Sequence, residues 1–581
     1  MAPEQSDAFC CVTGLRDGML GAKNPRAMAG ARPFYALCSQ GIDAFTCDRA
    51  SALALCYDGA CGTSGESVFA ASFPAAERLV LVCGCDAPEK LKALCAPWAA
   101  ERALAETREH WKRRLGSFAL ESGCDELDRL MNGWVAYQAL ACRVLGRCSL
   151  YQSGGAYGFR DQLQDTVNLL SLDSSLAREQ ILRSCAHQYT EGDVQHWWHE
   201  TGGAPKGVRT RCSDDLIWLP WALCQYVEKT GDESLCREET PYLISKELGE
   251  NERDRYEEAR TSELRESVLA HCVRAMEAVI LRGTGPHGLL PMGGGDWNDG
   301  FDKVRGESQW LTAFYAETAL AFADLLERLG EGKPARYRDA AAALTEALDK
   351  SWDGAWYRRG TYADGRPLGS AESKECRIDS VSQSAAAFFR GSDPEKVRTA
   401  LESAAERLFD REHGLIKLFD PPFAGREHPG YVESYGPGFR ENGGQYTHGA
   451  LWLIQALLRT GETDLAWEML RAILPAGKDS AVYKAEPFVL SADVYTAPGH
   501  EGEAGWSWYT GAAGWLYRIV TEELLGLKLR GGLLTIEPNL PAALPGYRAV
   551  FAGHEISVEN GRIRVDGKDY NGGGIRPEIH K

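Results

Sequence analysis

Apolar residues recur at helical spacing through most of the chain, from about residue 125 to residue 526. These stretches are separated by loops rich in glycine or aromatic residues. Apolar positions that repeat every three or four residues predict amphipathic helices. The expected helices are at residues 126–147, 164–185, 214–229, 261–282, 308–329, 335–351, 379–390, 394–408, 444–460, 463–474 and 508–525.

The two ends of the chain have a different pattern, in which short apolar runs are broken by Gly, Pro and Asp. Such runs, where they alternate or are β-branched, predict strands. We expect strands at residues 67–71, 78–83, 533–537, 547–551 and 563–565. Residues 89–114 have a helical composition and are expected to form a connecting helix.

Eleven or twelve helices without intervening strands indicate paired helices in a closed ring, an (α/α)6 barrel whose long loops gather at one end. We therefore predict a mainly α protein in four parts. They are a partial N-terminal β-region (1–85), a helical linker (86–124), the barrel (125–526) and a small C-terminal β-sandwich (527–581).

Composition excludes several classes of partner. The net charge of −18, from 64 basic and 82 acidic residues, argues against nucleic acid or an anionic membrane. We find no apolar run of the roughly 18 residues that a membrane span needs, and no signal peptide. The 18 cysteines lack paired CxxC spacing, so we expect free thiols in the cytoplasm and no structural zinc.

The loop PMGGGDWNDGFD is the first candidate for chemistry. Three glycines precede Asp296, Trp297 and Asp299, so the backbone can approach a ligand closely. An indole offers a sugar ring a flat apolar face, and the carboxyl groups can bind hydroxyls or protonate a leaving oxygen. A turn capped by Asp296 with Trp297 in the core fits the same string.

Two further loops carry charged and aromatic residues. In YQSGGAYGFRDQLQD, Arg160 is a donor beside the acceptor Asp161, which suits the vicinal hydroxyls of a sugar; a plain helix start is the alternative. In EGDVQHWWH, His196 and His199 flank two tryptophans. We expect sugar stacking and packing there, since a zinc site would need a third ligand.

The last two glycine-rich loops each lead into an apolar helix. YVESYGPGFRENGGQYTHGA places Gln445, a candidate substrate contact, and Thr447 with His448 before one helix. HEGEAGWSWYTGAAG places Thr510 and Gly511 before the next. Free N–H groups at a helix start favour an anion, although helix capping and an ordinary buried histidine explain the same residues.

Five motifs in order, YQSGGAYGFRDQLQD, EGDVQHWWH, GGGDWNDG, RENGGQYTHGALW and GWSWYTGAAGW, together resemble glycoside hydrolase family 94, the inverting glycoside phosphorylases. The resemblance covers about residues 85–581. It implies an N-terminal β-sandwich, a helical linker, an (α/α)6 barrel and a C-terminal β-sandwich, with no metal or organic cofactor. It also implies that Asp299 is the general acid and that Arg160, Asp161 and Trp297 hold the reacting sugar.

The resemblance assigns phosphate binding to His448, Thr510 and Gly511. Phosphate is then a co-substrate and the nucleophile, so a single carboxylic acid suffices, and a second carboxylate would repel the anion. We expect phosphate to attack the anomeric carbon of a β-linked gluco-oligosaccharide and give α-glucose 1-phosphate. The resemblance also suggests a homodimer.

Two departures from the family pattern affect these expectations. The first 85 residues are fewer than the family's N-terminal β-sandwich usually has. Ser153, Gly154 and Gly155 stand where disaccharide-type members carry an extra Arg, which favours the β-1,2-glucan type.

Two alternatives stay open at this point. An inverting hydrolase would need a carboxylate to activate water, and the candidates are Glu433, Glu441, Glu501 and Glu503. A non-catalytic carbohydrate-binding protein would bind sugar without turnover.

Overall fold

The computed structural model describes residues 80–84, 87–149, 154–200, 205–249 and 252–577, together with the backbone of five strands between residues 12 and 72. The chain divides into two compact units. The first comprises residues 1–114 with 200–203, and the second comprises residues 115–199 with 204–581.

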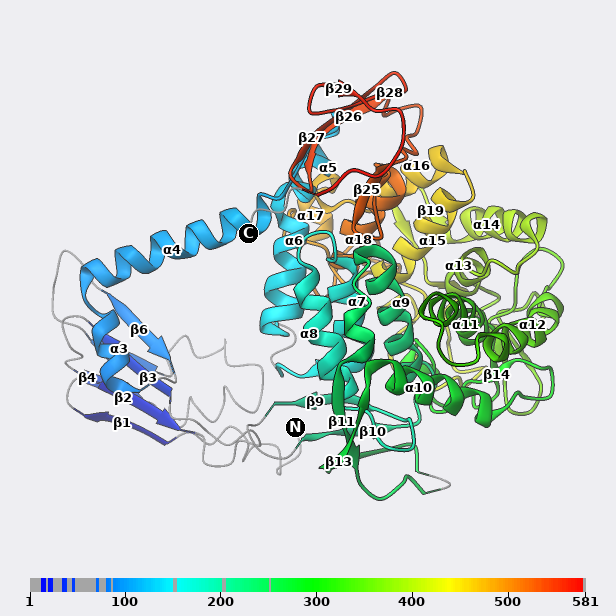
Figure 1. The fold of residues 1–581 in the computed structure, drawn as a ribbon, viewed down its shortest axis with the longest axis horizontal. Helices are drawn as coiled ribbons and strands as arrows, with labels where there is room; N and C mark the ends of the chain where they lie inside the picture. The colour runs from blue at the N-terminus through cyan, green and yellow to red at the C-terminus, as the bar shows by residue number, and fades with distance from the viewer. Residues whose placement is uncertain are drawn as a thin grey trace. The chain divides into compact units, whose positions relative to one another are not determined.

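The first unit contains an antiparallel sheet and two helices (Figure 1). The sheet order is β1 (Val12–Arg16), β2 (Met19–Lys23), β3 (Phe34–Cys38), β6 (Leu81–Gly84), and β4 (Ala44–Cys47) pairs with β5 (Phe69–Ser72). The helices are α3 (Pro88–Leu94) and α4 (Pro97–Leu115). The single connecting helix expected at residues 89–114 is therefore wrong, because Pro97 has no N–H with which to continue α3.

The second unit is mainly helical. Six helices contact one another in a closed cycle, α7 to α9, α11, α13, α15, α18 and back to α7, and α8, α10, α12, α14 and α16 pack against members of this cycle. The helices are α5 (Asp125–Arg129), α6 (Val135–Gln138), α7 (Phe159–Asn168), α8 (Ser174–Cys185), α9 (Trp218–Thr230), α10 (Val268–Arg282), α11 (Gln309–Leu329), α12 (Pro334–Lys350), α13 (Ser380–Phe388), α14 (Pro394–Leu408), α15 (Thr447–Arg459), α16 (Thr463–Ile473), α17 (Ser480–Tyr483) and α18 (Ala512–Arg518).

The sequence explains which helices belong to the cycle. α15 is buried along its whole length except for Arg459, as expected of a helix that is apolar on every side. α12 packs outside the cycle and buries a single stripe, which includes Tyr337, Ala341, Leu344 and Leu348. Amphipathic pattern thus places α12 on the surface and α15 in the core.

Two predicted helices are corrected by the structure. The helix expected at 164–185 is two, because α7 ends at Asn168 and Asp173 accepts a hydrogen bond from the Ser175 N–H to begin α8. The helix expected at 261–282 starts as strand β13 (Arg260–Ser267), which pairs with β11 (Glu239–Ile244). Its Glu, Leu and Arg residues favour a helix locally, and the pairing overrides that preference.

Strands lie at two opposite ends of the helical array (Figure 1). One sheet has the order β12 (Asp254–Glu258), β10 (Lys206–Thr210), β9 (Gln195–His199), β8 (Tyr157–Gly158). The other has the order β29 (Lys568–Asp569), β28 (Arg562–Val565), β27 (His554–Glu559), β26 (Gly546–Phe551), β7 (Phe118–Glu121). Strand β7 lies within residues 86–124, which were expected to be helical, and the expectation of no strands between helices is also wrong.

The remaining strands are short ribbons between helices. They are β14 (Leu290–Pro291), β15 (Glu307–Ser308), β16 (Gly360–Thr361), β17 (Pro367–Leu368), β18 (Ile378–Asp379), β19 (Phe409–Asp410), β20 (Leu415–Ile416), β21 (Phe419–Asp420), β22 (Gln445–Tyr446) and β23 (Asp493–Val494), with β24 (Leu527–Arg530) and β25 (Leu533–Ile536) near the C-terminus.

Among the described residues, no helix combines the length and the apolar character that crossing a membrane requires. The ten cysteines whose state the structure describes carry free thiols.

Candidate functional site

The loop before α11 presents Asp299 at the start of a short helical turn. Gly293 and Gly295 have φ values of 65° and 133°, which glycine adopts without strain. The Oδ1 atom of Asn298 accepts a hydrogen bond from the Gly300 N–H at 2.9 Å. This cap fixes the turn, and the Asp299 side chain remains 30% exposed.

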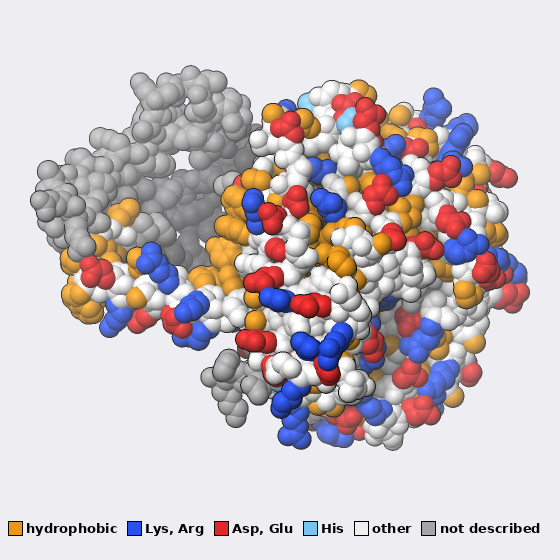
Figure 2. All heavy atoms as spheres, turned by 90° about the horizontal axis from the view of Figure 1, so that it is seen from above, with side chains coloured by type: hydrophobic (Ala, Val, Ile, Leu, Met, Phe, Trp, Pro, Cys, Tyr) orange, Lys and Arg blue, Asp and Glu red, His pale blue; other side chains and the backbone are white. Residues whose placement is uncertain are grey.

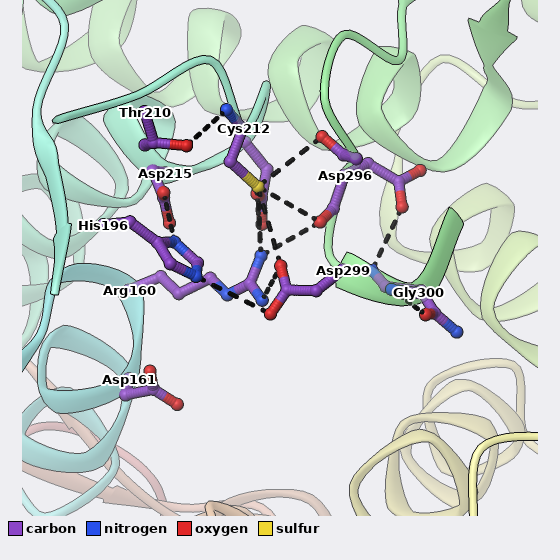
Figure 3. A network of polar contacts seen from close by, with 12 residues as sticks. Arg160, Asp161, His196, Thr210, Cys212, Asp215, Asp296, Asp299 and Gly300 are labelled. Carbon is purple, nitrogen blue, oxygen red and sulfur yellow. Dashed lines mark hydrogen bonds and ion pairs between the residues drawn. The ribbon is translucent and has the colours of Figure 1, made fainter. Parts of the chain in front are cut away.

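Arg160, at the start of α7, holds the Asp299 carboxylate (Figure 3). Its Nη2 atom donates to Oδ1 of Asp299 at 2.7 Å. Its Nη1 atom donates to Oδ1 of the buried Asp214 at 2.9 Å and to the main-chain oxygen of Asp296 at 3.0 Å. One guanidinium therefore joins helix α7, the loop before α9 and the Asp299 loop.

His196, on strand β9, approaches Asp299 from another side (Figure 3). Its Nε2 atom lies 3.7 Å from Oδ2 of Asp299, and its Nδ1 atom lies 2.7 Å from Oδ2 of Asp215. Asp215 is fully buried, whereas the His196 side chain is 23% exposed. The imidazole thus lies between two carboxylates.

These contacts set the charge states of the site. Burial opposes ionisation of Asp299, but Arg160 and His196 outweigh burial and lower its pKa well below the ordinary value. Burial also opposes the charged form of His196, but Asp215 and Asp299 raise its pKa well above the ordinary value. The resting site therefore pairs an ionised Asp299 with a protonated His196.

One cluster at the site has the donor atoms of a metal centre. His196, Cys212 and Asp299 place one potential ligand atom each within 4.8 Å of one another. The Arg160 guanidinium already occupies the position next to two of these ligand atoms, since Nη1 lies 3.7 Å from the Cys212 sulfur and Nη2 donates to Asp299. We therefore assign no metal to these residues.

Asp296 and Trp297 lie deeper than Asp299. Asp296 is fully buried, and its carboxylate accepts hydrogen bonds from Arg359 at 2.6 Å and Ser308 at 2.6 Å. These bonds indicate that Asp296 stabilises the loop, and they favour this role over the predicted contact with a sugar. Trp297 is 8% exposed and packs against Trp452 with ring centroids 4.8 Å apart, so much of its indole belongs to the core.

The predicted phosphate-binding residues meet at the start of α18. A Cβ atom added to Gly511 would lie 3.2 Å from Nδ1 of His448 and 3.7 Å from Nη2 of Arg143. The adjacent Thr510 is buried, and its hydroxyl accepts a hydrogen bond from the Ala512 N–H at 3.2 Å. We name His448, Thr510, Gly511 and Arg143 the anion cradle.

The anion cradle combines one charged donor with neutral ones. Burial and the nearby Arg143 lower the pKa of His448 to about 3, so its imidazole is neutral. Its buried Nε2 atom has no hydrogen-bond partner within the described residues. A buried polar atom without a partner is unfavourable. The ring edge that faces Gly511 carries Nδ1, which can donate to an anion there when it holds the ring proton.

Helix α7 connects the anion cradle to Asp299. Arg160 bonds Asp299, and the next residue, Asp161, accepts from Nη2 of Arg143 at 2.9 Å. The indole of Trp297 also lies next to the imidazole of His448, with ring centroids 5.3 Å apart. The residues predicted for acid catalysis and for phosphate binding therefore belong to one connected cluster.

Gln445 has its own partners beside this cluster. It is buried; its Oε1 atom accepts from the Ile416 N–H at 2.9 Å, and its Nε2 atom donates to Thr447 at 3.2 Å. These bonds place Gln445 in the support of the α15 start.

Two residues of the site were not assigned these positions from the sequence. Arg143 lies in a helical stretch where nothing local distinguishes it from a surface arginine. His196 was expected to stack or pack with the tryptophans beside it. Of those tryptophans, Trp198 is fully buried and stacks on His187, with ring centroids 3.9 Å apart.

Of the four glutamates considered as bases, Glu441 is the one whose pKa responds to Asp299. Burial and the Asp299 charge raise the pKa of Glu441 to about 7, against the opposing effect of Arg440. Glu433 accepts from His428, Glu501 accepts from the Gly499 N–H, and Glu503 pairs with Lys484.

Comparison with known proteins identifies the family. Residues 110–526 match the family described as "Glycosyl hydrolase 94 superfamily, catalytic domain". The cyclic beta-(1,2)-glucan synthase NdvB of Rhizobium meliloti (strain 1021) is 40% identical over 493 residues, which cover 81% of this chain and 17% of NdvB. The N,N'-diacetylchitobiose phosphorylase of Vibrio proteolyticus is 28% identical over 504 residues, which cover 79% of this chain and 60% of that protein.

The chain therefore spans less than two thirds of the length of either relative. Among solved structures, a bacterial glucoamylase complexed with acarbose superposes with a TM-score of 0.55 at 11% identity, covering 88% of this chain and 72% of that one. This likeness is one of fold alone. The predicted family is confirmed, and the chain belongs to the glycosyl hydrolase 94 superfamily through its catalytic domain, residues 110–526.

Proposed function

We propose that the protein is an inverting glycoside phosphorylase, in which inorganic phosphate cleaves a β-linked gluco-oligosaccharide and yields α-glucose 1-phosphate. The observation that supports it is the connection made by α7, whose consecutive residues Arg160 and Asp161 bond Asp299 and Arg143. An acid and an anion cradle held by one helical turn can act on the same sugar.

In the proposed mechanism, the reacting sugar lies between Asp299 and the anion cradle. Arg143 neutralises the charge of phosphate, and the Gly511 N–H, the Thr510 hydroxyl and the neutral His448 ring donate to its oxygens. Phosphate attacks the anomeric carbon while Asp299 protonates the leaving oxygen. The proposed reaction uses no organic cofactor. We also propose that the closed cycle of helices is the inner ring of an (α/α)6 barrel.

The proposed linkage is β-1,2. The family relative with 40% identity is named as a cyclic beta-(1,2)-glucan synthase, and a 1,2-beta-oligoglucan phosphorylase of Listeria innocua is 24% identical over 452 residues, 71% of this chain and 40% of that protein. The proposed location is the cytoplasm. Free thiols are typical of a reducing compartment, and phosphate and glucose 1-phosphate are available there as reactant and product.

Replacement of Asp299 tests the proposal. We expect Asp299→Asn to lower kcat/KM for phosphorolysis of a β-1,2-glucodisaccharide by at least about a hundredfold, since general acid catalysis typically contributes about 10²–10⁴. Release of glucose 1-phosphate is measured with and without phosphate. Asp364→Asn, at an exposed turn where Asp364 pairs with Arg366, is the matched control and should retain wild-type activity.

Hydrolysis is the second candidate, because Glu441 responds electrostatically to Asp299. A hydrolase would release glucose at the same rate without phosphate and would lose that activity in Glu441→Gln. Product formation independent of phosphate would therefore refute the phosphorylase and support the hydrolase. Sugar binding without any turnover would leave the chain a carbohydrate-binding protein.

A further inference from the structure

Three side chains form a continuous line into the site: Asp215, His196 and Asp299 (Figure 3). Each comes from a different element, so the line exists only in the folded protein. Asp215 is fully buried, and its Oδ2 atom is 2.7 Å from Nδ1 of His196, which fixes the ring. The opposite ring atom, Nε2, faces Oδ2 of Asp299 at 3.7 Å.

The proposed general acid lacks its proton in this arrangement. Asp299 accepts a bond from Arg160 at 2.7 Å and faces the imidazole, and two cationic partners favour the carboxylate. A general acid must nevertheless be protonated when the leaving oxygen departs. The imidazole of His196 is the group able to give up a proton that faces Oδ2 of Asp299, with Nε2 at 3.7 Å.

We propose that His196 stores the proton that Asp299 delivers to the leaving sugar, and that Asp215 positions His196 for this transfer. The inference rests on the proposed phosphorylase function. Negative charge from bound phosphate raises the pKa of Asp299 and so favours its neutral form, and His196 supplies the proton. Asp215 is fully buried and acts through its contact with Nδ1 of His196, so it is a positioning residue.

The proton balance closes without another reactant. The Nε2–H bond of His196 breaks as an O–H bond forms on Asp299, and that proton passes to the glycosidic oxygen as its bond to the anomeric carbon breaks. A phosphate oxygen bonds the same carbon, and hydrogen phosphate loses its proton as the ester dianion forms. That proton restores His196 through solvent, so no net proton is released.

Several charged groups of the site lie around His196 in the part of the chain that the structure describes. Asp215 and Asp299 face its two nitrogens, Asp161 and Arg160 on α7 interact with the same carboxylate network, and Cys212 lies beside it. Glu441 adds a group that senses Asp299. The acidic residues of this set retain the proton on His196 in the resting site.

The test compares substrates that differ in their need for an acid. In His196→Asn, the asparagine can still bond Asp215 but has nothing at the Nε2 position. We expect kcat/KM for the β-1,2-glucodisaccharide to fall at least about tenfold, within the range of general acid catalysis. Activity on β-glucosyl fluoride, whose leaving group needs little protonation, should stay within about threefold of wild type.

The pH dependence gives a second reading. Without His196, Asp299 must take its proton from solvent, while Arg160 still favours the ionised carboxylate over the neutral acid. We therefore expect the basic limb of the kcat profile to move to lower pH by at least about one unit. His413→Asn is the control, because it removes the imidazole of a similar Asp–His pair, in which Nδ1 of His413 is 2.9 Å from Asp410. It should change neither the relative activity on the two substrates nor the pH profile of kcat.

Several outcomes would overturn the inference. An unchanged pH profile in His196→Asn, or equal losses on both substrates, would show that His196 has only a structural role. If thermal melting shows that this variant is unfolded, Asp215→Asn replaces it, with the same expected direction. Wild-type protein without phosphate-dependent turnover would refute the proposed function itself, whereas an active wild type with an insensitive His196→Asn would refute only the proton store.

Discussion

The anion cradle obtains its positive charge from Arg143 and its remaining donors from neutral groups. Arg143 is shared with Asp161 and Asp165, at 2.9 Å from each, so part of its charge is already balanced. Neutral donors then matter for affinity, and Thr510 supplies one that can be removed with little change of shape.

We expect Thr510→Val to raise KM for phosphate about tenfold or more. A hydrogen bond to a charged group contributes about 1.5–3 kcal/mol, and 1.4 kcal/mol is about a factor of ten. KM for the disaccharide should change little, as measured by initial rates with each substrate varied in turn. Thr521→Val is the control, since the buried Thr521 hydroxyl bonds only main-chain oxygens of its own helical segment.

An equal rise in both KM values would contradict this assignment of Thr510. The hydroxyl also accepts from the Ala512 N–H at the start of α18, so thermal melting of the variant separates loss of this bond from loss of the phosphate contact.

Individual site residues differed in how far the sequence could identify them. Asp299, His448 and Gly511 stand in distinctive glycine-rich strings, and the structure gathers them in one cluster. Arg143 and Asp215 stand in ordinary helical surroundings, and only tertiary contacts give them a position at the site. Asp296 has the right chemistry for a sugar contact, but Arg359, 63 residues away, takes its carboxylate.

The N-cap residue of helix α11, Ser308, also holds the loop that carries Asp299. The Ser308 hydroxyl accepts from the Leu311 N–H at 3.0 Å, which caps the helix, and donates to Asp296 at 2.6 Å. Arg359 also donates to it at 3.1 Å. The start of α11 and the Asp299 loop are therefore stabilised by one side chain.

We expect Ser308→Ala to destabilise the protein by more than the roughly 0.5–2 kcal/mol of a lost cap, because the Asp296 bond is lost as well. Activity should fall too, since the loop that carries Asp299 loosens. Ser267→Ala is the control: Ser267 caps α10 through the Ala270 N–H at 3.2 Å and has no link to the site. Urea denaturation and initial rates measure both variants, and equal effects would show that the Asp296 bond adds nothing.

Element boundaries followed the sequence where capping residues were explicit. The predicted helix at 394–408 matches α14, which Asp393 caps and Pro394 begins. Residues 169–172 are too leucine-rich to show where α7 ends. Residues 260–267 are a strand only because β11 lies beside them, and no local pattern could show that partner.

Buried histidines with lowered pKa values, among them His187 and His271 as well as His448, make the stability of the folded protein sensitive to acid. Burial lowers the pKa of His187 and of His271 to about 4, so both are neutral in the folded state. His271 is fully buried between Gln188 and Thr240, at 2.8 Å and 2.9 Å. In the unfolded chain these rings take up protons below about pH 6.5.

We expect the free energy of unfolding to fall as the pH is lowered from about 6.5 to 4, by up to about 3 kcal/mol for His271 alone. The unfolded state binds more protons in this window, so the contribution of His271 is complete above pH 6.5 and is lost as the pH falls towards its folded pKa. In His271→Gln this component should be absent, so urea denaturation at pH 7 and pH 4 should show a smaller difference than in wild type.

His413→Gln provides a control of opposite sign. The hydrogen bond to Asp410 raises the pKa of His413, so its contribution is present at low pH and is lost as the pH rises. An identical pH dependence in His271→Gln and wild type would show that His271 is not the sensitive group.

The described residues on the face shown in Figure 2 offer no one-sign field to a large charged partner. Acidic and basic side chains are interspersed over the face shown in Figure 2. Many of them pair, as Arg338 does with Asp324 and Arg390 with Glu317. An anionic reactant therefore depends on the local charge of Arg143 and Arg160 against a net charge of −18.

The adjacency of Arg160 and Asp161 in the first turn of α7 limits how the proposed phosphorylase can diverge. Consecutive helical residues point about 100° apart, and here Arg160 bonds Asp299 on one side while Asp161 bonds Arg143 of the anion cradle on the other. Inserting or deleting a single residue at this point would change the direction of both side chains and break both bonds, the one to Asp299 and the one to Arg143. A descendant that exchanged phosphate for another nucleophile would have to rebuild its acid at the same time.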